Sequence, residues 1–198
     1  MILLGASGHG KVIADILKLS GETQIEFWDD NPASVMLGYK VSLRQQTTAD
    51  NVILSIGNNA TRKKIADASS YNYGIAFHPA SILAKDIAVG KGTVIMACAI
   101  INSGSCIGKH CIVNTAAVID HDGIIENYVH ISPNATLAGN VKVKEGAWVG
   151  AGATIIEGVS IGNWAVIGAG SVVINDVPDN AIVVGNPAKI IKYNKIIK

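Results

Sequence analysis

One histidine in this 198-residue sequence lies between two acids, in the stretch Asp120-His121-Asp122. A carboxylate beside an imidazole raises its basicity and can fix its tautomer. The stretch therefore favours general-base chemistry near neutral pH. Other histidines lack such neighbours: we expect a structural role for His78, which precedes a proline, and a solvated turn at His110.

A repeat of six residues indicates which elements position His121. From Leu83 to Val173 every sixth residue is Leu, Ile or Val, sixteen in succession, a period that no helix or ordinary strand has. A parallel β-helix with three short strands per coil explains it, because each aliphatic residue then stacks on its equivalent in the next coil, about 4.8 Å away. His121 takes an outward position in the hexad that begins at Ile119. A β-sandwich would require the spacing to be coincidental.

The first eighty residues follow a different pattern, in which strands and helices alternate. The ranges expected as strands are 1–4, 24–28, 51–56 and 74–77, and those expected as helices are 11–19 and 61–68. This order predicts a small parallel α/β unit, whose ligands bind at the carboxyl ends of the strands. Three turns lie at those ends: the glycine-rich stretch 5–10, Asp29-Asp30, and Gly57-Asn58-Asn59.

The glycine-rich stretch Gly5-Ala6-Ser7-Gly8-His9-Gly10 suits a phosphate group, because bare N–H groups at a helix N-terminus attract anions. Acidic residues about twenty positions later are equally typical of NAD binding. A purely structural role, in which the glycines only permit a tight turn, also stays open. The unit is about half of a full dinucleotide-binding fold, which favours another nucleotide ligand.

Composition excludes several classes of protein. Hydrophobic residues make up 49% and charged residues 16% of the chain, a balance that excludes disorder. The net charge is +1 and the basic residues are scattered, so we expect no nucleic-acid partner. No apolar run approaches the ~20 residues of a membrane helix, and the N-terminus lacks the basic region of a signal peptide. We therefore expect a cytoplasmic protein without membrane insertion.

The repeat, the tail and the N-terminal turns together resemble a known family. The hexads, followed by Val177-Pro178 and Asn186-Pro187-Ala188-Lys189, are similar to the hexapeptide-repeat acyltransferases. With the glycine turn, the two acids and the stretch 56–59, nearly the whole chain resembles one subfamily. It comprises sugar acetyltransferases related to UDP-N-acetylbacillosamine N-acetyltransferase and to sialic acid O-acetyltransferases.

The resemblance implies a mainly β fold, a left-handed parallel β-helix preceded by a small Rossmann-like α/β domain. It implies a nucleotide-sugar-binding domain at 1–80, a β-helix acetyltransferase domain at 81–178, and a tail at 179–198 that contributes to the acetyl-CoA site. The implied acceptor is a UDP-linked amino sugar, and acetyl-CoA is the co-substrate, with no metal. A homotrimer with acetyl-CoA between adjacent chains is also implied.

The resemblance also assigns roles to individual residues. His121 is the general base and Asp122 its orienting acid. The spacing itself suggests a further role, because Gly139 lies one coil beyond His121 and its N–H is placed to stabilise an oxyanion. Relatives carry Glu at the position of Asp122, so Asp120 stays open as a substitute. The sugar-nucleotide positions are Ser7, Gly8, His9, Asp29, Asp30 and Gly57, and the acetyl-CoA positions are His130, Ala151 and Ala169. Lys189 is a candidate partner of a CoA phosphate, and a solvated terminal lysine is the alternative there.

The favoured reaction is direct transfer of acetyl to the amino group of a UDP-4-amino-4,6-dideoxy sugar. O-acetylation of a sialic acid-like sugar is the alternative within the family. Two further alternatives are a γ-carbonic anhydrase-like metalloenzyme and a non-catalytic trimerisation module. The metalloenzyme requires three metal histidines, whereas His121 and His130 are half a coil apart and are expected on different faces.

Overall fold

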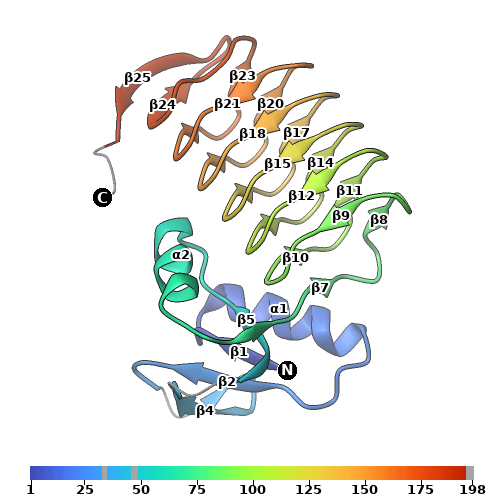
Figure 1. Cartoon of the computed structure of the whole chain (residues 1–198), viewed down its shortest axis with the longest axis vertical. Coiled ribbons are helices and arrows are strands. Elements are labelled where there is room, and N and C mark those ends of the chain that lie inside the picture. The colour runs from blue at the N-terminus through green and yellow to red at the C-terminus, as the bar shows by residue number, and fades with distance from the viewer. Residues whose placement is uncertain (33–34, 46–48, 195–198) are drawn as a thin grey trace.

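The computed structural model describes residues 1–32, 35–45 and 49–194. An N-terminal α/β unit packs against one end of a long parallel β-helix (Figure 1). Both parts of the expected architecture are therefore confirmed. Within the described residues, no helix is long and apolar enough to cross a membrane.

The α/β unit contains one sheet of order β3-β4-β2-β1-β5-β6. Its elements are β1 (Ile2–Leu4), α1 (Gly8–Leu19), β2 (Glu26–Asp29), β3 (Val35–Met36), β4 (Tyr39–Leu43), β5 (Asp50–Leu54), α2 (Asn59–Asp67) and β6 (Asn72–Tyr73). Strands β3 and β4 were not expected from the sequence, and β4 extends the sheet by pairing in parallel with β2. Helix α1 begins at Gly8, earlier than expected, so half of the glycine-rich stretch forms the first turn of the helix.

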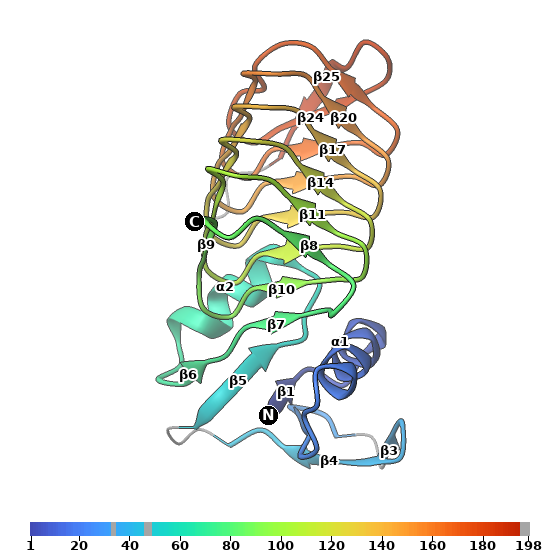
Figure 2. The same ribbon diagram turned by 90° about the vertical axis from the view of Figure 1, so that its right-hand side faces the viewer.

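The β-helix contains three sheets, and the coils stack regularly on one another (Figure 2). Sheet I comprises β7 (Ala76–Phe77), β10 (Val94–Ile95), β13 (Ile112–Val113), β16 (His130–Ile131), β19 (Trp148–Val149), β22 (Val166–Ile167), β24 (Ala181–Val184) and β25 (Lys189–Tyr193). Sheet II comprises β8 (Ile82–Leu83), β11 (Ile100–Ile101), β14 (Val118–Ile119), β17 (Thr136–Leu137), β20 (Thr154–Ile155) and β23 (Val172–Val173). Sheet III comprises β9 (Ala88–Val89), β12 (Cys106–Ile107), β15 (Ile124–Ile125), β18 (Lys142–Val143) and β21 (Ser160–Ile161).

The strand register confirms the stacking expected from the hexads. Leu83 pairs with Ile101, and Ile101 with Ile119, each one coil further along the chain. Ile101 and Ile119 are buried, as expected for residues that point to the axis of the β-helix. The pattern therefore identifies the core of the β-helix directly.

The β-helix extends beyond the hexads at both ends. The strand expected at 74–77 was assigned to the α/β unit, but the observed strand β7 pairs with β10 in sheet I, which corrects that expectation. At the other end, β24 pairs in parallel with β22, and β25 folds back antiparallel on β24. The start of the tail thus continues the β-helix.

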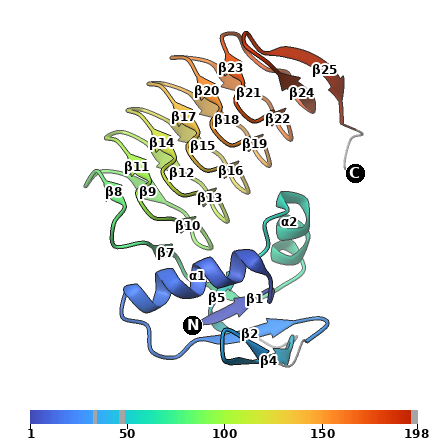
Figure 3. The ribbon, with the colours of Figure 1, turned by 180° about the vertical axis from the view of Figure 1, so that it is seen from behind.

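The α/β unit and the β-helix share a hydrophobic core. Ile13 and Ile16 on α1 are buried in the same cluster as Val94, Met96 and Ile112 of the first coils. Figure 3 shows α1 between the N-terminal sheet and this end of the β-helix. The shared core holds the glycine turn at a set place relative to the β-helix.

Candidate functional site

His121 lies at the corner between β14 and β15 with its imidazole in solvent, and 52% of its side chain is exposed. Its Nδ1 atom is 2.8 Å from Asp122 Oδ2. A carboxylate in this place favours the tautomer with a proton on Nδ1, which leaves Nε2 free to accept a proton. This hydrogen bond is the largest cause of a raised pKa at His121.

Asp120, the alternative partner of His121, is engaged elsewhere. Its Oδ1 atom accepts hydrogen bonds from Asn102 Nδ2 at 2.7 Å and from the His121 backbone N–H at 2.8 Å. These two bonds lower the pKa of Asp120 and hold its carboxylate at the backbone. The carboxylate that contacts the imidazole is therefore that of Asp122.

Gly139 lies directly beneath the imidazole, one coil beyond His121. A Cβ atom at Gly139 would overlap His121 Nε2, so any side chain there would displace the ring. Within the described residues, the Gly139 N–H donates no hydrogen bond to the protein. The geometry leaves this N–H beside the nitrogen expected to act as the base.

A pocket of about 280 Å³ lies at the carboxyl ends of β1, β2 and β5, as expected for an α/β unit. It is lined by Leu4, Gly5, Ser7, Asp29, Asp30, Ile56, Gly57, Thr61 and Ile65. Four of the six expected sugar-nucleotide residues thus line one pocket. Gly8 lies nearby on the surface at the first position of α1, where a Cβ atom would meet no other atom within 4 Å.

The two acids after β2 have different surroundings. Asp29 Oδ2 accepts a hydrogen bond from the Ala6 N–H at 2.8 Å, and its Oδ1 accepts one from the Asn31 N–H at 2.9 Å. Its carboxylate therefore holds the glycine turn in place. Asp30 is 74% exposed and lies 3.8 Å from the nearest guanidinium nitrogen of Arg44, so Asp30 is the acid free to contact a ligand.

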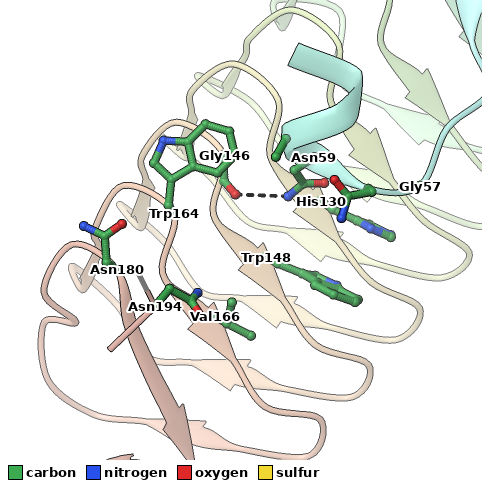
Figure 4. A pocket seen from close by; sticks show the side chains of 11 residues that line it. Gly57, Asn59, His130, Gly146, Trp148, Trp164, Val166, Asn180 and Asn194 are labelled. Carbon is green, nitrogen blue, oxygen red and sulfur yellow. Dashed lines mark hydrogen bonds between the residues drawn. The ribbon is translucent and has the colours of Figure 1, made fainter. Parts of the chain in front are cut away.

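A second pocket of about 460 Å³ lies between the N-terminus of α2 and the outer face of sheet I (Figure 4). His130 lines it, with its ring stacked on Trp148 at 5.8 Å between centroids. Burial, with Arg62 and His9 nearby, lowers the pKa of His130 to about 3, so its imidazole stays neutral at pH 7. Because Gly57 lines both pockets, the two are adjacent.

His9 has a different environment from the one expected of a turn residue. It lies in the first turn of α1, and its Nε2 atom is buried with no hydrogen-bond partner within the described residues. Burial and the charge of Arg62 lower its pKa to about 4. His9 also contributes to the lowered pKa of His130, after burial and the charge of Arg62.

The other three expected acetyl-CoA residues lie outside the pocket that contains His130. Ala151 and Ala169 are exposed and stacked one coil apart, at the corner between sheets I and II. The Gly170 N–H donates to the Ala151 carbonyl at 2.8 Å, which fixes this stacking. Lys189 is exposed at the start of β25, beside a pocket of about 330 Å³ at the end of the last coil.

The candidate residues do not converge on one point of a single chain. His121 lies at the corner between sheets II and III, whereas His130 lies on the outer face of sheet I. The α/β pocket adjoins the region of His130 through Gly57. Within one chain, His121 and the α/β pocket therefore lie on different sides of the β-helix.

The position of His110 differs from the one expected from the sequence. It was expected at a solvated turn, but only 4% of it is exposed. Its ring stacks on Tyr128 at 5.3 Å, with an interplanar angle of 2°. Sequence reasoning also missed Arg62, which is 1% exposed at the same junction, because its neighbours Lys63 and Lys64 made it resemble part of a solvated helix face.

The described part of the chain contains no set of side chains that could bind a metal ion. Within residues 1–32, 35–45 and 49–194, no three His, Cys, Asp or Glu side chains lie close enough to hold an ion. His121 and His130, the histidines that a γ-carbonic anhydrase-like site would require, project from different sides of the β-helix.

A parallel β-helix with an exposed His–carboxylate pair, joined to an α/β unit with a pocket at its glycine turn, defines a class of acyltransferases. Residues 1–68 match the PglD N-terminal domain, and residues 140–175 match the bacterial transferase hexapeptide (six repeats). A histidine-to-asparagine variant of perosamine N-acetyltransferase from Caulobacter crescentus, in complex with CoA and GDP-perosamine, has 35% identity and a TM-score of 0.90. The match covers 96% of this chain and 95% of that chain.

Two further relatives are also acetyltransferases. The acetyltransferase domain of PglB from Neisseria gonorrhoeae, in complex with acetyl coenzyme A, is 33% identical over 96% of this chain and 98% of its own, with a TM-score of 0.90. UDP-N-acetylbacillosamine N-acetyltransferase from Bacillus subtilis is 40% identical over 108 residues, which cover 48% of this chain and 50% of that protein. The chain thus spans about half the length of this curated relative. It belongs to the left-handed β-helix, hexapeptide-repeat sugar N-acetyltransferases.

Proposed function

We propose that the protein transfers acetyl from acetyl-CoA to the amino group of a UDP-linked 4-amino-4,6-dideoxy sugar in the cytoplasm. The observation that carries this proposal is the pair His121 Nδ1–Asp122 Oδ2 at 2.8 Å, with Gly139 beneath the ring. The names of the relatives support the substrate class, because they include a UDP-sugar N-acetyltransferase and an enzyme bound to CoA and a GDP-amino sugar.

The reaction needs a base and a site for negative charge. The neutral amine attacks the thioester carbonyl, and His121 Nε2 takes the proton that the amine loses as the C–N bond forms. The Gly139 N–H donates to the oxyanion of the tetrahedral intermediate. That intermediate breaks its C–S bond, and the CoA sulfur leaves with the proton from His121. Because the transfer is direct, no acyl-enzyme forms.

The α/β pocket holds the nucleotide part of the acceptor in this proposal. The N–H groups at the start of α1, around Ser7 and Gly8, face the diphosphate, since a helix N-terminus attracts anions. Asp30 accepts hydrogen bonds from the ribose or the base. On the other side of the site, Ala151 and Ala169 leave room for the pantetheine arm, and Lys189 pairs with a CoA phosphate.

The separation of His121 from the α/β pocket supports a homotrimer whose acetyl-CoA sites lie between adjacent chains. We predict complementation between His121→Ala and Gly8→Val, because each inactive chain then supplies the part that the other lacks. Random mixing of the two at equal amounts should restore about one quarter of parental activity. The measurement is the rate of CoA release after the mixed chains are denatured and refolded together.

Two controls accompany the mixing experiment. A double variant that carries both His121→Ala and Gly8→Val should stay inactive after the same denaturation and refolding. Light scattering of the parent protein should give three times the mass of one chain. A monomer at micromolar concentration, or mixed chains no more active than either variant alone, would refute an active site shared between chains.

The pH dependence of the reaction follows from the raised pKa of His121. The base works only when neutral, so activity should rise as the pH passes the pKa of His121, above its usual value of 6.5. Asp122→Asn removes the largest cause of the rise, so the acidic limb of the kcat/KM profile should move to lower pH while the maximal rate falls. A hydroxyl acceptor separates this limb from titration of the acceptor amine. An unshifted limb in Asp122→Asn would contradict the assignment.

The substrate class is tested by a thiol-release assay with acetyl-CoA and a panel of acceptors. We expect turnover with UDP-4-amino-4,6-dideoxy sugars and none with sialic acids. Turnover with GDP-linked amino sugars alone would show that the acceptor carries GDP rather than UDP. Turnover with sialic acids alone would establish O-acetylation. Calorimetry that detects NAD and no UDP-sugar would overturn the proposed role of the α/β pocket.

A further inference from the structure

Arg62 on α2 is a buried cation without an acidic partner among the described residues. Only 1% of the residue is exposed, yet all five N–H donors of its guanidinium are used. Every acceptor is a neutral oxygen within 3.1 Å: the carbonyls of Ile56, Gly57, His110 and Tyr128, and the side-chain Oδ1 of Asn59.

These acceptors come from both parts of the molecule. Arg62 Nη1 holds the carbonyls of Ile56 and Gly57, in the turn between β5 and α2. Arg62 Nε and Nη2 hold the carbonyls of His110 and Tyr128, which occupy equivalent corners of successive coils. The guanidinium therefore ties the wall of the nucleotide-sugar pocket directly to the β-helix.

Asn59 extends the same set of bonds to a third coil. Its Oδ1 accepts from Arg62 Nη2 at 3.0 Å, and its Nδ2 donates to the carbonyls of Gly146 and Ala147 at 3.1 Å. Gly146 stands one coil beyond Tyr128. The corner residues His110, Tyr128 and Gly146 have positive φ of 54°, 61° and 68°, so three equivalent corners of the β-helix contact one end of α2.

If Arg62 served only to stabilise the fold, a buried charge would be an unfavourable choice. A buried charge loses its hydration, and a well-packed apolar side chain of similar volume is often at least as stabilising. Burial lowers the pKa of Arg62 to about 10, so the side chain remains charged at neutral pH. Five fixed donors on a planar group set the direction of five acceptors, which a flexible ammonium cannot do.

We propose that Arg62 is a positioning residue, which sets the turn at Gly57 relative to the β-helix and so aligns the bound acceptor sugar for acetyl transfer. Gly57 lines the 280 Å³ pocket proposed for the nucleotide, so a shift of this turn moves the wall of that pocket. The inference rests on the proposed function for its kinetic consequence. The anchoring of the turn itself does not require that function.

The kinetic test compares Arg62→Lys with the parent enzyme, using acetyl-CoA and the best UDP-amino sugar of the panel. Lysine keeps the charge but has three donors on one nitrogen, so it cannot span both sets of carbonyls. We expect kcat to fall ~10²-fold, since a displacement of about 1 Å can cost that much. The KM for the nucleotide sugar should rise ~10-fold, whereas the KM for acetyl-CoA and the acidic limb of the pH profile should not move.

Two further variants separate positioning from loss of stability. Asn59→Ala removes only the Asn59 side-chain bonds, including the contact to the third coil, and should shift the same parameters in the same direction, by less. Ile161→Val lowers the stability of the β-helix core, in a cluster that contains no residue of α1 or α2, and should leave both KM values unchanged. The proposal is overturned if Arg62→Lys retains parental kinetics, or if an equally destabilised Ile161→Val shows the same changes in kcat and KM.

Hydrogen exchange provides a readout that needs no acetyl acceptor. In Arg62→Lys, the amides of residues 56–61 should exchange ~10-fold faster or more, while those of the central coils stay protected. If the parent acetylates no nucleotide sugar, the proposed function fails, and this measurement still tests the anchoring. Unchanged exchange at residues 56–61 would refute the anchoring whatever the substrate is.

Discussion

Replacing His121 by alanine should lower kcat by about 10²–10⁴-fold, the range typical of a positioned general base. The imidazole is exposed, and its only hydrogen bond within the described residues is to Asp122, so its loss should hardly change folding. Its Nε2 atom acts on the transferred proton rather than on binding. The affinities for acetyl-CoA and for the nucleotide sugar should therefore stay near their parental values, as measured by calorimetry.

The matched control is His78→Ala, which removes a histidine elsewhere on the chain. His78 Nδ1 accepts a hydrogen bond from the Ala80 N–H, and the residue has no place in the proposed reaction. This variant should keep parental kcat. If His121→Ala also keeps it with the true acceptor, His121 is not the base, and Asp120 and His130 are the next residues to replace.

Replacing Gly8 by valine should reduce nucleotide-sugar binding by ~100-fold or more while acetyl-CoA binding stays unchanged. A Cβ atom at Gly8 would meet no protein atom within 4 Å, and the φ of Gly8 is not positive, so the protein itself accommodates a side chain there. The cost arises when the diphosphate approaches. Losing about two charge-assisted hydrogen bonds corresponds to the expected change in affinity.

Lys11→Val is the matched control, because it introduces the same β-branched residue at an exposed position of α1, one turn further along. Both variants place the same side chain on the same helix, so a difference in binding reports on the pocket. Gly5 and Gly10 are unsuitable for this test. A Cβ at either would lie within 3.0 Å of backbone or side-chain atoms of the protein itself. If Gly8→Val and the parent bind the nucleotide sugar equally well, the diphosphate does not bind at this turn.

The features that the sequence predicts well are those carried by spacing along the chain. One aliphatic residue in every six predicts the β-helix, since each coil repeats the same inward position and the register follows. The His121–Asp122 contact is similarly local, because the two residues are adjacent. The glycine turn and Gly57 were placed at one pocket by the rule that parallel strands end at the same edge.

Tertiary structure decided the features that depend on which distant segments meet. Asp29 and Asp30 are neighbours with similar side chains, yet one caps the glycine turn and the other is exposed. His110 and Arg62 gave no local sign of burial, and both are buried because α2 packs on a corner of the β-helix.

Strand β7 belongs to the β-helix for the same reason, because its partner β10 lies one coil away. Periodicity records the environment that a residue shares with its equivalents in every coil. The junction between the α/β unit and the β-helix occurs only once, so no repeat in the sequence indicates it. Its buried charge and its hydrogen bonds emerge only when the two parts pack together.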